Sequence, residues 1–450
     1  MNSITQDLTQ EVEKLMQTIL NFNVAGGISP EWEKVEIAVK EFLIEYAKRQ
    51  LKELDAAVFS DRPKEWKVEK KDVERELTTE IGKLEFERRY YKNDKTGCYA
   101  YLTDLVAGFE KGSKIDIGLG LKLVKNPGDD SYAKSSRLAC EGKISKQSVM
   151  KLVRRTHDYE LDEPKRRPGV KVIHIQADED HNALQTGHKT ITKLITVHEP
   201  ARKMKKRTWL PQKRHFTGHL DKPIDLWEEV LDYIHEVYDE DVKVYIHGDG
   251  AGWIKTGLEI IPGSEFIIDR YHLYEKVDKI SKSNFHYKCK IFQYFRHERY
   301  DLLKVLLDTI AANDEITEDA AEEAYTYFKN NKAGIRNLLR LPGETVKSCA
   351  EGQVSHILSD RLSSRPKAWM PQGLDAVSKI RVFHINGGEL KPENLKKKNR
   401  TLEIHKKKIE HLRKKYAPNL CCNNVDINKL MPKAGDNRFL KAIAGSLAGL

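Results

Sequence analysis

The chain has 450 residues, of which 39% are hydrophobic, and its 78 Lys and Arg residues outnumber its 68 Asp and Glu residues, giving a net charge of +10. This length and apolar content exclude a disordered chain and allow two or three domains, while the basic excess favours a polyanionic partner over an acidic substrate. Six cysteines without C-x-x-C spacing argue against a zinc module or a disulfide framework, and no apolar run approaches the roughly 20 residues needed to span a bilayer. We therefore expect a cytoplasmic protein that does not enter the membrane.

The N-terminal part of the chain predicts helices followed by a β-hairpin. Residues 1–62 carry apolar side chains at helical spacing, which predicts helices used for core packing or self-association. Residues 63–110 form a hairpin-like region, with strands expected at 84–91 and 98–102 around a glycine-containing turn.

Residues 111–163 predict a helix-turn-helix-like DNA-binding region. A helix at 132–140 and a short turn precede a second helix at 146–155, with Ser145 as its N-cap. Basic and amide side chains on such a helix suit phosphate and base-edge contacts in a major groove. The residues expected to contact DNA are Lys146, Gln147, Lys151, Arg154 and Arg155. An ordinary amphipathic helical hairpin would have the same pattern, and a basic linker at 164–169 follows it.

Two strand-like runs beyond this linker each lead to an aspartate. Residues 170–178 nearly alternate and end at Asp178, and residues 242–249 repeat the design up to Asp249. Two further strands and one helix lie between them, at about 189–198, 207–216 and 224–239. The resulting β-β-β-α-β order is that of the front half of a ribonuclease H-like domain.

These aspartates, with one distant glutamate, predict a metal site. Two strands that end in Asp can place carboxylates side by side, and Mg²⁺ prefers such hard oxygen ligands. Each Asp also has a structural alternative, because Asp before Gly is common in turns and Asp after a strand often caps a helix. The third acid, Glu351, opens a helix after a strongly helical, polar stretch that we expect to form an all-α insertion at 276–343.

The sequence around these acids carries a family resemblance. Residues 349–356 read CAEGQVSH and are followed by Arg361, Arg365 and Trp369, and the segments around Asp178 and at 269–272 accompany them. On these motifs the chain resembles the ISLre insertion-sequence transposases, relatives of the Mutator-like transposases, from the N-terminal hairpin to about residue 388.

This resemblance implies a DDE transposase with a split ribonuclease H-like catalytic domain. Asp178, Asp249 and Glu351 take the catalytic and metal-binding positions, with Mg²⁺ or Mn²⁺ as cofactor and two ions expected. His272 and Asp269 match an acidic-x-x-His signature of the wider superfamily, although many Mutator-like relatives have Cys in place of Asp269. His272 either acts in catalysis or packs structurally at the start of a helix.

Neighbouring acids offer an alternative to the first catalytic position. Strand alternation places Asp178 and Asp180 on one face and Glu179 on the other. The resemblance selects Asp178.

Basic residues outside the helix-turn-helix region suggest further DNA contacts. They lie in the stretch 202–207, just beyond the Glu351 helix, and in lysine clusters within 391–416. The individual residues expected to contact DNA are Lys205, Lys206, Arg207, Arg361, Arg365, Lys397 and Lys407. The C-terminal clusters are alternatively a solvated helix face, and Trp369 either stacks on a base or is buried.

The whole sequence predicts an α/β protein in which a ribonuclease H-like catalytic domain is interrupted by an all-α insertion and preceded by a mainly α DNA-binding region. The expected domains are 1–62 (helical association), 63–110 (hairpin), 111–163 (helix-turn-helix-like), 169–275 (core, first part), 276–343 (insertion), 344–388 (core, catalytic Glu helix) and 389–450 (basic tail).

The expected function is that of an insertion-sequence transposase that cleaves DNA at the element ends and transfers strands. Its partners would be terminal inverted repeats and target DNA, with at least a dimer assembled on paired ends at the nucleoid. The alternatives are a ribonuclease H-like nuclease without strand transfer and a catalytically silent DNA-binding derivative.

Overall fold

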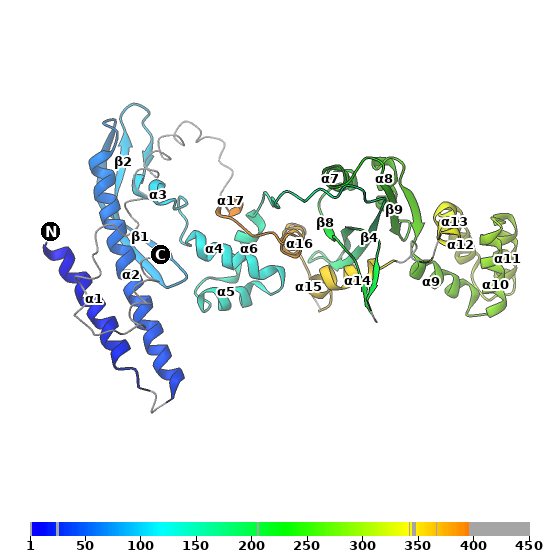
Figure 1. The fold of residues 1–450 in the computed structure, drawn as a ribbon, viewed down its shortest axis with the longest axis horizontal. Helices are drawn as coiled ribbons and strands as arrows, with labels where there is room; N and C mark the ends of the chain where they lie inside the picture. Colours follow the sequence, from blue (N-terminus) through cyan, green and yellow to red (C-terminus); the bar gives the residue numbers. More distant parts are fainter. Residues whose placement is uncertain are drawn as a thin grey trace. The chain divides into compact units, whose positions relative to one another are not determined.

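The computed structural model describes residues 2–23, 27–204, 207–341, 343, 348–365 and 367–395 (Figure 1). These residues divide into two compact units. The first contains the residues up to Leu123, Ala133–Leu152 and Leu395, and the second contains Val124–Tyr132 and Val153–Asn394. Within the described ranges, no helix is both long enough and apolar enough to cross a membrane.

The first unit begins with two helices and an antiparallel sheet. Its elements are α1 (Asn2–Leu20), α2 (Ile28–Asp61), β1 (Trp66–Thr78), β2 (Lys83–Asn93) and β3 (Tyr99–Ala100). The strands pair in the order β1-β2-β3, and apolar residues of α2, β1 and β2 share one core. Helices are therefore present where residues 1–62 predicted them.

The hairpin differs from its prediction. The expected first strand lies within β2, but the main partner of β2 is β1, and the expected second strand shrinks to the two residues of β3. The sequence concealed β1 because charged residues fill most of it and its pairing register shifts between Val68 and Val73. At Asp72, within that interval, φ is 52°, which breaks the strand alternation.

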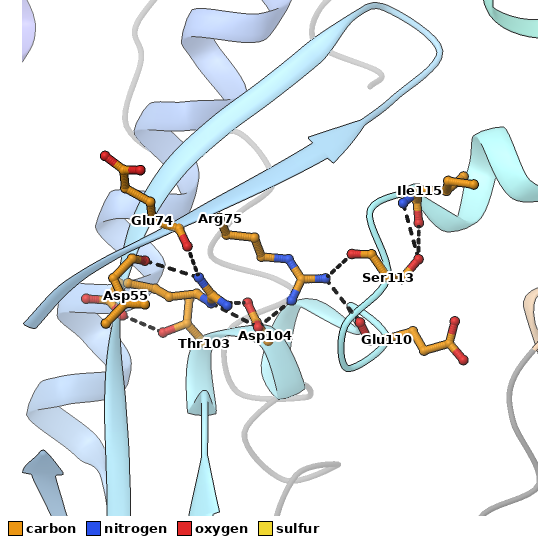
Figure 2. A network of polar contacts seen from close by, with 10 residues as sticks. Asp55, Glu74, Arg75, Thr103, Asp104, Glu110, Ser113 and Ile115 are labelled. Atoms are coloured by element: carbon orange, nitrogen blue, oxygen red, sulfur yellow. Dashed lines mark hydrogen bonds and ion pairs between the residues drawn. The ribbon is translucent and has the colours of Figure 1, made fainter. Parts of the chain in front are cut away.

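A buried network of charged side chains ties this sheet to the segment that follows it (Figure 2). Asp104 Oδ2 accepts hydrogen bonds from Arg75 (2.5 Å) and Arg88 (2.9 Å), and all three side chains are buried. Arg75 also donates to the carbonyls of Glu110 and Ser113 (3.1 Å each), and Arg88 donates to two carbonyls of β1. The charge of Asp104 is thus balanced by the chain's own guanidinium groups.

Short helices complete this part of the chain. They are α3 (Leu102–Ala107), α4 (Ile117–Lys125), a 3₁₀ turn η2 (Asn126–Gly128), α5 (Tyr132–Cys140) and α6 (Lys146–Arg155). The bounds of α5 and α6 agree with the predicted helix pair. Ser145 caps α6 as expected, because its Oγ accepts a hydrogen bond from the backbone N–H of Ser148 (3.2 Å).

The second unit is built on a five-stranded mixed sheet. Its strands are β4 (Val172–Ala183), β5 (Lys189–His198), β8 (Arg214–Gly218), β9 (Lys243–Gly248) and β10 (Glu265–Ile268), in the order β10-β9-β4-β5-β8. The pairs β4-β5 and β5-β8 are antiparallel, whereas β4-β9 and β9-β10 are parallel. The predicted strand at 207–216 is instead two strands, since β7 (Arg207–Trp209) pairs with β6 (Arg202–Met204) in a separate hairpin.

The two faces of β4 differ in chemistry. Ile173, Ile175 and Ala177 belong to the apolar core, together with residues of α7 (Pro223–Val237) and α8 (Gly252–Ile260). The alternate positions carry buried polar residues, among them Gln176 and Asp180. The polar face is therefore the one available for chemistry.

Helices fill the chain from β10 to the end of the described residues (Figure 1). After β10 come α9 (Arg270–Ser281), α10 (Phe285–Arg296), α11 (Tyr300–Ala312), α12 (Glu318–Asn330) and α13 (Lys332–Arg340). Glu351 then lies on α14 (Ala350–Val354), which continues without a break into a π-helical turn η3 (Ser355–Ser359) and α15 (Asp360–Leu362). Two separate helices follow, α16 (Pro371–Ile385) and α17 (Pro392–Leu395). Between β10 and Glu351 the described residues contain helices and no strand, in agreement with the predicted helical segment.

Candidate metal centre

The sheet brings the first two predicted acids to neighbouring positions. The parallel register pairs Gln176 of β4 with His247 of β9, so continuing it by two residues places Asp178 beside Asp249. Asp178 does not end its strand, as the sequence suggested, because β4 continues to Ala183 along β5. It lies instead next to the end of β9.

Three side chains converge at this position. Asp178, His272 and Glu351 each offer a ligand atom, and these atoms all lie within 4.8 Å of one another. Asp178 is buried, His272 is half-buried and Glu351 is exposed, so the group opens to solvent on the side of Glu351. Residues far apart in the sequence thus form one compact set of possible metal ligands.

Asp178 is electrostatically unsatisfied. Its Oδ1 accepts a hydrogen bond from the backbone N–H of Glu179 (2.8 Å), whereas Oδ2 is buried without a hydrogen-bond partner in the described part of the chain. Burial is the largest cause that raises the pKa of Asp178 to about 7, and the charges of Glu351 and Asp249 add to the increase. The charge interaction with His272 lowers the pKa of Asp178. A cation bound here would relieve this destabilisation.

Asp249 lies in the turn between β9 and α8, outside the group of three. Its Oδ1 accepts a hydrogen bond from the N–H of Ala251 (2.9 Å), and its carbonyl accepts one from the Tyr327 hydroxyl of α12 (3.0 Å). Gly250 has φ 93°, and a Cβ there would lie 2.3 Å from Asn331 Oδ1. Residues of the helical segment after β10 therefore contact this turn and restrict its conformation. Asp249 stabilises the turn through its own hydrogen bonds and also lies near Asp178.

The Asp269–His272 pair proves to be a helix cap. Asp269 Oδ1 accepts a hydrogen bond from the backbone N–H of His272 (3.1 Å), and the Asp269 N–H donates to the carbonyl of Gly248 (2.7 Å). The first bond fixes the opening turn of α9 and the second ties it to β9. Asp269 thereby fixes the backbone of His272, whose imidazole lies close to Asp178 and Glu351.

Two side chains of β4 anchor the segment that carries Glu351. Gln176 Oε1 accepts hydrogen bonds from the Ser348 hydroxyl (3.0 Å) and the backbone N–H of Cys349 (3.3 Å), just before α14. Beyond α14, Asp180 Oδ1 accepts hydrogen bonds from the hydroxyls of Ser359 (2.8 Å) and Ser363 (2.7 Å). Asp178 lies between these two anchors on the same face of the strand, so they hold Glu351 opposite it.

The acids adjacent to Asp178 are occupied elsewhere. Glu179 points to the opposite face, where it accepts a hydrogen bond from Trp253 Nε1 (2.6 Å). The second oxygen of Asp180 accepts a hydrogen bond from Asn182 Nδ2 (2.7 Å). Sequence reasoning did not identify Gln176 and Asp180 as anchors. The sequence contained a sign of these anchors, because Gln176 and Asp180 lie two residues before and after Asp178, on the same buried face of the strand.

A group of histidines on the same face does not neutralise these acids. His174 Nδ1 lies 2.9 Å from His247 Nε2, and Gln176 Nε2 lies 3.2 Å from His198 Nε2. Burial lowers the pKa of all three imidazoles, that of His174 to about 4. They are therefore neutral at neutral pH and stabilise the polar face through hydrogen bonds.

The predicted DNA contacts fall into different surroundings. Lys146, Gln147, Lys151 and Arg365 are exposed, and Arg154 and Arg155 are half-buried. Lys205, Lys206, Lys397 and Lys407 lie outside the described residues, and for Arg207 only the backbone in β7 is described.

Arg361 does not occupy the surface that its prediction required. The side chain is buried, donates to the carbonyls of Pro127 (2.9 Å) and Asp130 (2.8 Å), and packs 5.0 Å from the Trp369 ring centre. Trp369 is itself buried, and its Nε1 donates to the carbonyl of Leu362 (2.9 Å). Both residues therefore stabilise the fold, and the expected DNA contact of Arg361 is corrected on this ground.

Comparison with known proteins identifies relatives over nearly the whole chain. The model of an uncharacterised protein family, UPF0236, matches residues 30–399. One UPF0236 protein of Caldanaerobacter subterraneus subsp. tengcongensis is 36% identical over 456 residues, covering 97% of this chain and 96% of its own. A second from that strain is 37% identical over 456 residues, covering 98% and 96%, and its name joins eleven gene labels. The chain therefore belongs to the UPF0236 family.

Proposed function

We propose that this protein is a metal-dependent DNA transposase that cleaves the ends of a mobile element and joins them to target DNA. The observation that carries the proposal is the convergence of Asp178, Glu351 and His272 within 4.8 Å, where an oxygen of the buried Asp178 has no hydrogen-bond donor among the described residues. Such a carboxylate needs a proton or a cation, and a cation next to a scissile phosphate is the usual requirement of phosphoryl-transfer enzymes.

The donor set fits Mg²⁺ or Mn²⁺. Carboxylate oxygens suit both ions, whereas an imidazole ligand suits transition metals better. Asp178 and Glu351 would hold the ion, and Asp249, whose charge helps to raise the pKa of Asp178, would contribute to a second one. When bound, the metal would supply positive charge that polarises the scissile phosphate and lowers the pKa of the attacking water or 3′-hydroxyl.

The remaining steps depend on side chains of the chain itself. We assign to His272, which is half-buried and held by its capped helix turn, the role of accepting the proton of the attacking hydroxyl, because its ring nitrogen lies within 4.8 Å of ligand oxygens of Asp178 and Glu351. Gln176 and Asp180 maintain the position of Glu351 against β4, so the acids need little reorganisation when substrate arrives. The exposed side of Glu351 gives a long polymer access to the acids.

The order of elements supports the same proposal. Strands β4, β5 and β8 form an antiparallel meander that continues through α7 into parallel β9, which is the β-β-β-α-β order expected of a ribonuclease H-like core. The helices α9–α13 interrupt the chain before the third acid, as the resemblance to ISLre transposases implies. Eleven gene labels in the name of one relative suggest a gene repeated in one strain, as expected of a mobile element.

A strand-transfer assay tests the proposal. Purified full-length protein would be incubated with labelled duplexes that carry the DNA flanking its gene, supercoiled target plasmid and Mg²⁺ or Mn²⁺. We expect cleavage near the element ends and joined products, both abolished by EDTA and by Asp178→Asn. The matched control is Glu179→Gln, which changes the adjacent acid on the opposite face and should retain both activities.

The outcomes separate the alternatives. Cleavage without joined products would favour a nuclease, and DNA binding without cleavage would favour a silent derivative. Full activity of Asp249→Ala would remove Asp249 from the proposed site, and full activity of Asp178→Asn would eliminate the site itself.

A further inference from the structure

A basic pocket lies on β4 beyond the anchored acids. It has a volume of about 560 Å³ and is lined on one side by His181 and Asn182 of β4 and by Lys189 of β5. The segment after α15 supplies Arg365 and Lys367 on the other side. The pocket is thus formed within the second unit, from the strand that carries Asp178 and the chain that follows Glu351.

The charge of this pocket is not balanced by its own walls. No Asp or Glu occurs among the described residues that line it. Although His181 Nε2 lies 3.9 Å from Glu179 Oε1, Lys189 and Arg365 form no ion pair with described residues. Lys367 donates to the carbonyl of Arg361, and burial together with the charges of Arg361 and Arg365 lowers the pKa of Lys367. An anion in the pocket would relieve this crowding of positive charge.

The pocket is connected to the metal centre through one anchor. Ser363, which lines the pocket, donates to Asp180, and Asn182 donates to the other oxygen of the same carboxylate. Asn182 is four residues beyond Asp178 on the same face, a spacing of roughly 13 Å along a strand. This distance suits a polymer that extends from the acids into the pocket.

We propose that the basic pocket binds a backbone phosphate of the DNA strand whose scissile phosphate lies at Asp178 and Glu351. This inference rests on the proposed function. The Arg365 guanidinium can bind two phosphate oxygens at once, and Lys189 and Lys367 add point charges. A phosphate held there fixes which phosphodiester of the strand reaches the acids, so the pocket selects the position of the cut.

Binding of single-stranded DNA tests the pocket apart from catalysis. Affinity of the full-length protein for fluorescent dT₁₂ would be measured by anisotropy in EDTA over a range of salt concentrations. We expect Lys189→Gln/Arg365→Gln to weaken binding roughly tenfold at low salt, and to reduce the salt slope by about 0.7 for each phosphate that is no longer neutralised. The control Arg296→Gln/Lys332→Gln removes the same charge from exposed positions of the helical segment and should leave the slope unchanged.

Other results would overturn the pocket. Equal decreases in affinity for both double variants would indicate a general charge effect, and weaker dTMP binding with unchanged dT₁₂ binding would indicate a free-nucleotide site. Arg365→Lys, which keeps the charge but not the paired donors, should weaken binding less than Arg365→Gln. Because dT₁₂ binding is measured in EDTA, where no cleavage occurs, a failure of the proposed catalysis leaves this result intact and the two failures are distinguishable.

Discussion

Two buried carboxylates, Asp104 in the first unit and Asp178 in the second, lie in opposite electrostatic surroundings. Asp104 accepts hydrogen bonds from Arg75 and Arg88, and neighbouring carbonyls accept further hydrogen bonds from those guanidinium groups (Figure 2). Asp104 Oδ1 and Asp178 Oδ2 are both buried without a hydrogen-bond donor among the described residues, but Arg88 Nε lies 2.9 Å from the former. Asp178 instead lies near two other acids and pairs with no described Lys or Arg.

The difference separates an acid whose charge is compensated within the fold from one that we propose to be functional. Burial raises the pKa of both side chains, but the charge of Asp104 is compensated by ion pairs within the fold. Asp178 lacks such a partner, so its buried carboxylate requires either a proton or a bound cation. Substitutions on the two sides of this contrast should therefore have different consequences.

The largest expected effect is on catalysis. Asp178→Asn keeps the shape of the side chain but removes its negative charge, so DNA cleavage should fall on the order of 10³-fold or more, because metal coordination supplies several kcal/mol of transition-state stabilisation. Rates from the cleavage assay, compared with Glu179→Gln, provide the measurement. Activity within tenfold of the wild type would show that Asp178 does not differ functionally from its neighbour.

Removing the charge of Asp104 should instead destabilise the fold. Asp104→Asn leaves two buried guanidinium groups without their counter-ion, and we expect the free energy of unfolding to fall by roughly 3–5 kcal/mol. Urea denaturation measures the change. Glu74→Gln, at an exposed position on β1, is the matched control and should alter stability little. If the free energy of unfolding of Asp104→Asn equals that of the wild type, Asp104 does not act as the counter-ion of Arg75 and Arg88.

The same substitution at Asp178 should have the opposite effect on stability. Because the folded pKa of about 7 lies above the ordinary value of 3.8, Asp178 favours the folded state below about pH 4 and loses that contribution as pH rises to 7. Without metal at pH 7.5, Asp178→Asn should therefore be more stable than the wild type, by at most about 4 kcal/mol. Urea denaturation at pH 4 and 7.5 in EDTA tests this, and a variant that is less stable at pH 7.5 would contradict it.

Loss of an anchor should have a smaller effect than loss of the acid. Asp180→Ala frees Ser359 and Ser363, so Glu351 is less well held, and activity or metal affinity should fall about 10–100-fold. The metal concentration that gives half-maximal cleavage should rise, and Ser359→Ala, which removes one of the two bonds, should raise it less. An unchanged metal requirement in Asp180→Ala would show that the anchor does not position Glu351.

The sequence predicted well where local chemistry determines the structure. Strand alternation and caps located β5, α5, α6 and the position of Ser145, because these depend on neighbouring residues. It failed at β1, where charged residues conceal a strand that is held mainly by β2 and a buried salt-bridge network. Tertiary pairing determines that strand.

The candidate site shows the same division. The acids were identified from motifs, but the cap between Asp269 and His272 could not be separated from a catalytic pair, and the anchors at Gln176 and Asp180 join segments up to 183 residues apart. The burial of Arg361 likewise depends on Pro127 and Asp130, far away in the sequence. Contacts between residues so far apart in the sequence cannot be predicted from local patterns, which show only that polar residues alternate along a strand.

Metal binding tests the contrast between the two carboxylates most directly. Mn²⁺ bound by the full-length protein would be counted by electron paramagnetic resonance at pH 7.5, for the wild type, Asp178→Asn, Glu351→Gln and Glu179→Gln. We predict that the wild type and Glu179→Gln bind Mn²⁺ in a saturable manner and that the other two variants lose this binding. Equal Mn²⁺ binding by all four proteins would contradict a metal centre at Asp178 and Glu351.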